Sequence, residues 1–223
     1  SEKLTLAKLL LQELKVDRIE VASARVSEGE FDAVQRITSW AKDAGYLDQV
    51  EILSFVDKGV SIDWMEKSGL KVQNLLTKGS LNHLTYQLKQ TQEEHFNNIA
   101  ENIELASSRG ISTNVYLEDW SNGMRNSASY VFSFLDFLST QKVNRILLPD
   151  TLGILSPEET ANYLSTIIAR YPKIHFDFHG HNDYDLGVSN AMEAVKAGVH
   201  GLHLTVNGMG ERAGNAPLAS VVA

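Results

Sequence analysis

The sequence predicts an α/β fold of the (β/α)8 barrel class, also called a TIM barrel, in a single domain over residues 1–223. Strand and helix patterns alternate strictly along the chain, and repeated βα units require parallel strands joined by helices. The strands carry aliphatic residues on one phase and increasingly polar residues on the other toward their carboxyl ends. No glycine-rich dinucleotide-binding turn follows an early strand, which disfavours a nucleotide-binding sheet.

A doubly wound open sheet is the competing architecture. Helices cover both faces of such a sheet, so both phases of each strand should be apolar. In this sequence the second phase is polar at the strand ends, as at the carboxyl mouth of a barrel. The residues on this phase are Glu20, Tyr116, Glu118, Thr151, His179, His181, Thr205 and Asn207.

The elements are assigned from apolar periodicity, which is three to four residues in a helix and two in a strand. The region 80–109 forms one helix or two, with a break near 89–91, and Gly110 ends it as a C-cap would. In chain order we expect helix 2–15 with Ser1 as its N-cap, strand 17–23, helix 28–44, strand 50–55, helix 61–67, strand 71–76, helical region 80–109, strand 111–118, polar loop 119–126, helix 127–140, strand 145–151, a helix opened by Ser156 and Pro157, a strand from Ile174, helix 186–197, strand 201–207 and a helix from Ala216.

The ends of the chain predict a fragment of a longer barrel. A βα barrel opens on a strand, but this sequence opens on a helix pattern and contains seven strand patterns. We therefore expect the first strand to precede Ser1 and the last helix to continue beyond Ala223.

The composition excludes several classes of function. The hydrophobic content of 43% and charged content of 22% are those of a globular domain. A net charge of −8 gives no basic surface for nucleic acid or anionic lipid. The absence of cysteine excludes thiolate metal sites. No apolar run reaches the roughly 18 residues of a membrane span, and no signal peptide opens the sequence, so we expect a cytoplasmic location.

Two histidines end the strand that begins at Ile174. His179 and His181 are two residues apart, so their side chains share one face and can converge on one metal ion. Gly180 between them allows close approach to the backbone. A His-x-His pattern alone is more often structural, so the metal interpretation depends on the polar residues at other strand ends.

Those residues are Glu118 as a candidate acid or base, Thr151 as a hydrogen-bond donor, and the loop 207–215, whose three glycines allow tight geometry beside a ligand. Each also has a structural interpretation. Glu118 could pair with a basic residue, Tyr116 could be core, and Thr151 could cap a loop. Glu211 and Arg212 are expected to form a local ion pair, and His83, His95 and His200 are assigned to the surface or to packing, away from any strand end.

The motifs His-Gly-His-Asn-Asp (179–183) and Gly-Met-Gly-Glu-Arg-Ala-Gly-Asn (208–215) resemble the signature of the acyl-CoA-dependent synthases and lyases built on a metal-dependent barrel. These include 2-isopropylmalate, citramalate and homocitrate synthases and hydroxymethylglutaryl-CoA lyase. The segments 148–153 and 118–119 also belong to this pattern. The run 114–123 is most similar to bacterial citramalate synthases.

The resemblance implies a condensation of acetyl-CoA, as co-substrate, with a 2-oxo acid, followed by thioester hydrolysis. It implies a divalent metal ion (Mn²⁺, Zn²⁺ or Mg²⁺) with His179, His181 and Asn215 among its ligands. Glu118 matches an acid/base carboxylate, and Thr151 matches a contact to the substrate carboxylate. The family also has an Arg-Asp-Gly segment at the end of the first strand, which these residues do not contain. The resemblance further implies a homodimer.

The 2-oxo acid is expected to be pyruvate, giving citramalate in branched-chain amino-acid biosynthesis. Tyr116 would fill space beside the ketone, and Leu53 and Leu76, near neighbouring strand ends, would form an apolar wall that favours a methyl group. The alternatives are 2-isopropylmalate synthesis from 2-oxoisovalerate, a carbon–carbon lyase of the hydroxymethylglutaryl-CoA type, and an inactive, truncated barrel.

Overall fold

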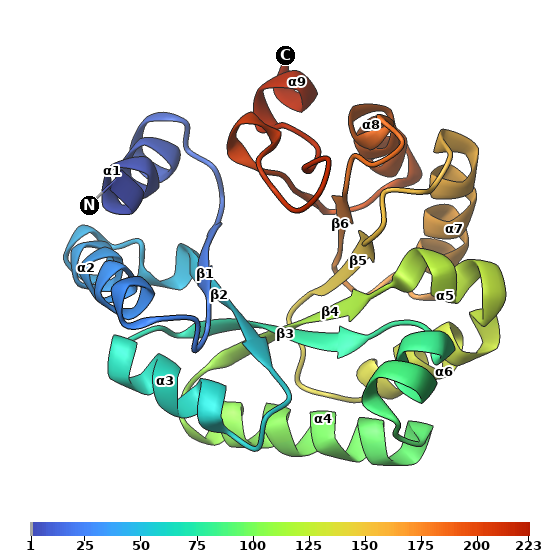
Figure 1. Cartoon of the computed structure of the whole chain (residues 1–223), viewed down its shortest axis with the longest axis horizontal. Helices are drawn as coiled ribbons and strands as arrows, with labels where there is room; N and C mark the ends of the chain where they lie inside the picture. Colours follow the sequence, from blue (N-terminus) through green and yellow to red (C-terminus); the bar gives the residue numbers. More distant parts are fainter. Residues whose placement is uncertain (1) are drawn as a thin grey trace. The chain divides into compact units, whose positions relative to one another are not determined.

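The computed structural model describes residues 2–223, and Ser1, expected as the first N-cap, lies outside the described residues. Helices and strands alternate along the chain (Figure 1). One seven-stranded sheet has its strands in chain order, β1 to β7. Each strand pair with a described register is parallel. A doubly wound sheet reverses its strand order at a switch point, so this uninterrupted order confirms the predicted α/β fold of an incomplete (β/α)8 barrel.

The chain divides into two compact units. The first contains the residues up to Leu76 together with Asn97–Asn114, and the second contains Thr77–Phe96 and Val115–Ala223. The boundaries fall inside β3, α4 and β4. The candidate site residues Leu53 and Leu76 belong to the first unit, and all the others belong to the second.

The first unit begins with a helix that continues into a π-helical turn. Ser27 caps α2, because its hydroxyl accepts a bond from Glu30 N at 3.2 Å, and Gly45 ends α2 with a φ of 79°. The elements are α1 Glu2–Lys8, η1 Leu9–Glu13, β1 Ile19–Ser23, α2 Glu28–Ala44, η2 Leu47–Gln49, β2 Val50–Phe55, α3 Val60–Ser68, most of β3 Val72–Lys78 and most of α4 Gln92–Ser108.

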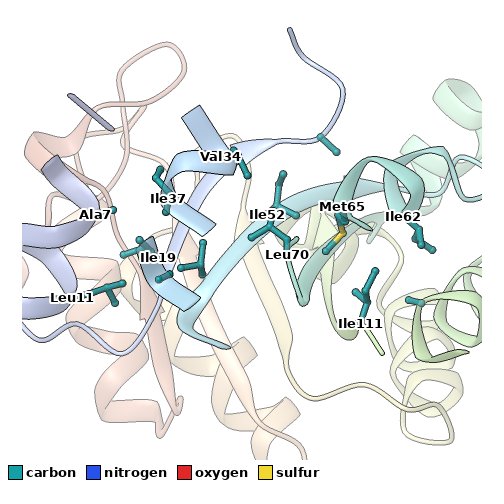
Figure 2. Close-up of a cluster of buried hydrophobic side chains, with 14 residues drawn as sticks. Ala7, Leu11, Ile19, Val34, Ile37, Ile52, Ile62, Met65, Leu70 and Ile111 are labelled. Atoms are coloured by element: carbon teal, nitrogen blue, oxygen red, sulfur yellow. The ribbon is translucent and has the colours of Figure 1, made fainter. Parts of the chain in front are cut away.

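The hydrophobic core of the first unit lies between its strands and its helices. Figure 2 shows aliphatic side chains from both kinds of element pointing toward one another. Burial of these side chains supplies the main favourable term in folding. The labelled residues are Ala7, Leu11, Ile19, Val34, Ile37, Ile52, Ile62, Met65, Leu70 and Ile111.

Polar side chains occupy the other face of the first unit's strands. Asn74 Nδ2 donates to Glu51 Oε2 at 3.0 Å and to Glu20 Oε2 at 2.5 Å. Register pairs Leu53 with Asn74 and Phe55 with Leu76, so Leu53 and Leu76 share this face. The expected polar phase is therefore present here.

The aliphatic phase is less uniform than expected. Gln73 lies on the face of Ile52, and its amide donates to Asn102 Oδ1 at 3.1 Å and to Thr113 Oγ1 at 2.9 Å. Ser54 Oγ donates to Gln73 Oε1 at 2.8 Å. These side chains are buried, and their mutual hydrogen bonds offset the cost of removing them from water.

The second unit contains the remaining elements. Its strands β5 and β6 lie side by side, with α7 packed beside α8 (Figure 1). The elements are η3 His83–Leu88, the end of β4 Ser112–Glu118, α5 Trp120–Asn126, α6 Ala128–Leu138, β5 Ile146–Asp150, α7 Pro157–Arg170, β6 Phe176–Gly180, α8 Gly187–Ala197, β7 Gly201–His203, η4 Val206–Gly208 and α9 Leu218–Val222.

Two expectations for the second unit were wrong, and one open alternative is resolved. The expected loop 119–126 is the helix α5, because buried Trp120 and Met124 lie four residues apart on one face. The last strand ends at His203, since a turn of 3₁₀ helix follows it at Val206. The region 80–109 is two helical segments, broken where Lys89 has a φ of 56°. Among residues 2–223, no helix is both long and apolar enough to cross a bilayer.

The N-terminus of α7 carries a capping box. Ser156 Oγ accepts a bond from Glu159 N, Glu159 Oε2 accepts one from Ser156 N, and Pro157 occupies the first turn. Ser156→Ala is expected to lower the free energy of unfolding by about 1 kcal/mol, because it removes one hydrogen-bond partner from a half-buried helix end. Urea unfolding would measure this. The exposed Ser165→Ala in the same helix is the control, and an equal loss in both variants would contradict the role of the cap.

Candidate functional site

His179 and His181 lie at the carboxyl end of β6. Phe176 and Phe178 are fully buried on the opposite phase, which orients His179 toward the polar face. The two imidazole centroids are 5.0 Å apart. The backbone N–H of His181 donates to Asp150 O at 3.2 Å. This hydrogen bond fixes the position of His181 beyond the end of β6. The two rings therefore lie close together, and their joint binding of one metal ion stays a prediction.

A third histidine, His203, joins them and was missed in the sequence. It ends β7 and pairs in register with His179. His203 Nδ1 is 2.9 Å from His179 Nδ1 and 3.0 Å from the Tyr116 hydroxyl. Strand alternation could have predicted that His203 lies on the polar face. Residue 203 shares the phase of Thr205 and Asn207, which were both assigned to that face.

The glycine-rich loop 207–215 brings Asn215 beside His181. The two residues form an isolated antiparallel bridge. A Cβ at Gly210 would lie 2.5 Å from Asn215 Nδ2, so only glycine leaves room for this amide. Gly214 has a φ of 89°, and a Cβ there would lie 2.2 Å from Gly208 O. The expected tight geometry of this loop is confirmed.

Arg212 links the loop to the neighbouring strand ends. Its Nε and Nη2 donate to the two carboxylate oxygens of Asp183 at 2.7 and 3.0 Å. Nη2 also donates to Thr151 O at 2.7 Å and lies 3.2 Å from His181 Nδ1. Arg212 does contact Glu211, as expected, but at 3.4 Å. Its closer, bidentate partner is Asp183.

Glu118, the last residue of β4, forms an ion pair with Lys78. Both side chains are mostly buried, with 19% and 13% exposed. The structural interpretation of Glu118 as a partner for a basic residue is thus correct. It does not exclude chemistry, because a carboxylate that forms an ion pair can still take part in proton transfer.

Tyr116 lies two residues before Glu118 and is buried. Its ring meets those of His179 and His203 edge to face, with centroid distances of 6.0 and 5.9 Å. Thr151 follows β5, and its hydroxyl accepts a bond from Asp119 N at 2.8 Å. A hydroxyl that accepts one bond keeps its proton to donate, so Thr151 both supports this loop and can still bind an acceptor.

The expectation that His83 lies away from any strand end was wrong. His83 Nδ1 is 3.8 Å from Glu118 Oε1, and Nε2 is 3.6 Å from Asp119 Oδ2. It therefore lies at the end of β4, since Gly79 N, just after β3, donates to Glu118 O at 2.6 Å within the second unit. His95 is a packing residue as expected. It is buried against Phe134, and burial lowers its pKa to about 4.

The environment favours the neutral forms of His179 and His181. Burial, followed by the neighbouring His203 and His181, holds the pKa of His179 well below its usual range. Burial and then the Arg212 charge lower the pKa of His181. A neutral imidazole offers a nitrogen lone pair, which a protonated ring does not.

The donor atoms fit a divalent cation in part. Asn215 Oδ1 is buried and has no hydrogen-bond partner among residues 2–223. His179 Nδ1 lies 3.2 Å from the carbonyl oxygen of His203, which leaves Nε2 available. The Arg212 guanidinium competes with a cation for the Nδ1 lone pair of His181. Within the same described residues, no three His, Asp, Glu or Cys side chains are grouped to hold a metal, so the candidate ligand set is two imidazoles and an amide.

Comparisons with known proteins assign the chain to a family. The family described as HMGL-like matches residues 1–223. A 2-isopropylmalate synthase of Sulfolobus acidocaldarius is 34% identical over 223 residues, which are 99% of this chain and 55% of that protein. A homocitrate synthase of Sulfurisphaera tokodaii is 32% identical over 215 residues, 96% of this chain and 45% of that protein. The chain spans about half the length of the curated relatives it matches.

Solved structures show the same fold. An HMG-CoA lyase of Bacillus subtilis has a TM-score of 0.82 at 16% identity, over 99% of this chain and 76% of that one. A hydroxymethylglutaryl-CoA lyase of Pseudomonas aeruginosa has a TM-score of 0.79 at 16% identity, over 99% and 76%. At this identity the likeness concerns the fold alone. The family match, by contrast, covers the whole chain, and this protein therefore belongs to the HMGL-like family.

Proposed function

We propose that this chain forms the catalytic part of an acyltransferase that condenses acetyl-CoA with a small 2-oxo acid. The observation that carries the proposal is the cluster of His179, His181 and Asn215 at adjacent strand ends, in a chain whose relatives are named 2-isopropylmalate and homocitrate synthases. The proposed substrate is pyruvate and the product citramalate. The runner-up substrate is 2-oxoisovalerate, which is favoured by the relatives named 2-isopropylmalate synthases.

The proposed reaction forms one carbon–carbon bond and breaks one thioester. The methyl group of acetyl-CoA loses a proton, and its carbon attacks the ketone carbon of the 2-oxo acid. The ketone oxygen takes up a proton and becomes a hydroxyl group. Water then cleaves the thioester to a carboxylate and free CoA.

In this proposal His179, His181 and Asn215 hold a divalent cation, and Arg212 must give up its contact with His181 Nδ1. A bound cation would polarise the ketone and stabilise the negative charge that develops on its oxygen. Three neutral N and O ligands suit Mn²⁺ or Zn²⁺ better than Mg²⁺, which prefers carboxylates and water.

The remaining site residues bind substrate and move a proton. Glu118 carries the acid/base role, and its ion pair with Lys78 holds the carboxylate in position. Thr151 donates its hydroxyl proton to the substrate carboxylate. Tyr116 limits the space beside the ketone. The expected contribution of Leu53 and Leu76, which belong to the first unit, stays a prediction.

The first test concerns the 2-oxo acid. Release of free CoA by the complete gene product is expected with pyruvate, with kcat/KM about 10–200-fold above that for 2-oxoisovalerate, because one or two carbons in an apolar pocket discriminate by about 1–3 kcal/mol. Absent or equal turnover with pyruvate would overturn the citramalate assignment, and cleavage of a 3-hydroxyacyl-CoA without any 2-oxo acid would indicate a lyase.

The second test concerns the acid/base group. Glu118→Gln is expected to lower kcat by about 10²–10⁴-fold, since the amide cannot take the methyl proton. The exposed Glu104→Gln removes the same charge elsewhere and serves as the matched control. Steady-state CoA release measures both. A kcat within the error of the control would remove Glu118 from the mechanism.

The third test concerns the cation. Gly210→Ala is expected to weaken Mn²⁺ binding by about tenfold or more. The added Cβ would lie 2.5 Å from Asn215 Nδ2 and would therefore push the Asn215 amide out of position. Isothermal titration calorimetry measures the affinity. Gly29→Ala is the control, since its nearest neighbour, Ser27 Oγ, is 4.0 Å away. Equal Mn²⁺ affinity in the two variants would show that Asn215 is not a ligand.

A further inference from the structure

His203 contacts two proposed functional residues, His179 and Tyr116. Its Nδ1 lies 2.9 Å from His179 Nδ1 and 3.0 Å from the Tyr116 hydroxyl. Its backbone carbonyl oxygen lies 3.2 Å from His179 Nδ1. The register pair of His179 with His203 causes this, because paired residues of parallel strands project on the same face.

The distances decide where the protons are. Two N–H groups cannot face each other at 2.9 Å, so one of the two Nδ1 atoms is unprotonated. The carbonyl oxygen of His203 only accepts, which places the proton on His179 Nδ1. His203 Nδ1 is then the unprotonated nitrogen, and it accepts a hydrogen bond from the Tyr116 hydroxyl. Each donor has its own acceptor in this arrangement.

We propose that His203 is a positioning residue that sets the tautomer and orientation of His179 and holds the Tyr116 hydroxyl in place. With the proton on Nδ1, His179 presents the bare Nε2 to a cation. The Tyr116 ring, which limits the pocket for the 2-oxo acid, is held by the same imidazole. The geometry of the cation ligand and the shape of the substrate pocket are thus coupled through one side chain.

This inference rests on the proposed role of His179 as a cation ligand, so its first measurement needs no metal. Nitrogen-15 NMR of the metal-free complete gene product reports which nitrogen of each histidine is protonated. Loss of signals in His179→Gln assigns the residue. The proposal expects the proton of His179 on Nδ1. A proton on Nε2 would overturn it.

The second measurement uses two substitutions of the side chain. His203→Asn keeps an acceptor near the position of Nδ1, whereas His203→Leu removes it at similar volume. His203→Leu is expected to lose about tenfold in Mn²⁺ affinity, the lower end of the range for partners of metal ligands, because the backbone carbonyl remains. Its KM for pyruvate should also rise. His203→Asn should recover most of both values.

The controls separate this proposal from a folding defect and from the proposed function. Leu202→Val changes the opposite face of β7 and should leave Mn²⁺ binding unchanged. Equal Mn²⁺ affinity in His203→Leu and the unmodified protein, or equal loss in His203→Leu and His203→Asn, would overturn the role of the side chain. If His203→Leu fails to fold, the protonated nitrogen of His179 found by NMR in the unmodified protein decides whether the proposal stands. Absence of Mn²⁺ binding in the unmodified protein would instead overturn the proposed function. The tautomer of His179, measured without metal, would still test the positioning role of His203.

Discussion

The register of the parallel strands β5, β6 and β7 is the constraint on which the candidate site depends. Pro149 pairs with His179, and His179 pairs with His203. A shift of one residue in either pairing would turn the affected side chains to the opposite face. The fully buried Phe176 and Phe178 prevent such a shift, because it would bring both aromatic rings to the polar face. The core of the second unit thereby positions its polar side chains.

The loop after β7 adds a steric constraint to this register. Gly208, Gly210 and Gly214 each lie where a Cβ would come within 3.0 Å of Asn215 or of the loop backbone. The hydrogen bond from Asn215 N to Gly208 O at 3.0 Å closes the loop. Asn215 is therefore held by backbone geometry rather than by side-chain partners, which is consistent with its buried and unpaired Oδ1 among residues 2–223.

Burial lowers the pKa values of both His179 and His181, and the charged groups around them are paired. Lys78 pairs with Glu118, and Arg212 pairs with Asp183. The Arg212 hydrogen bonds hold the pKa of Asp183 below its usual range. His179 and His181 therefore keep their lone pairs at a pH at which an ordinary histidine is half protonated.

The sequence by itself determined the alternation of strands and helices, the polar phase of the strands, and the two motifs that contain His179, His181 and Asn215. These are local properties, because periodicity and glycine spacing depend only on neighbouring residues. Only the tertiary structure placed His203 against His179, Lys78 against Glu118 and His83 near Asp119. Those contacts join residues that lie 24 to 40 positions apart, and sequence periodicity carries no register between separate strands. The tautomer proposed for His179, and with it the nitrogen proposed to bind a cation, depends on that register.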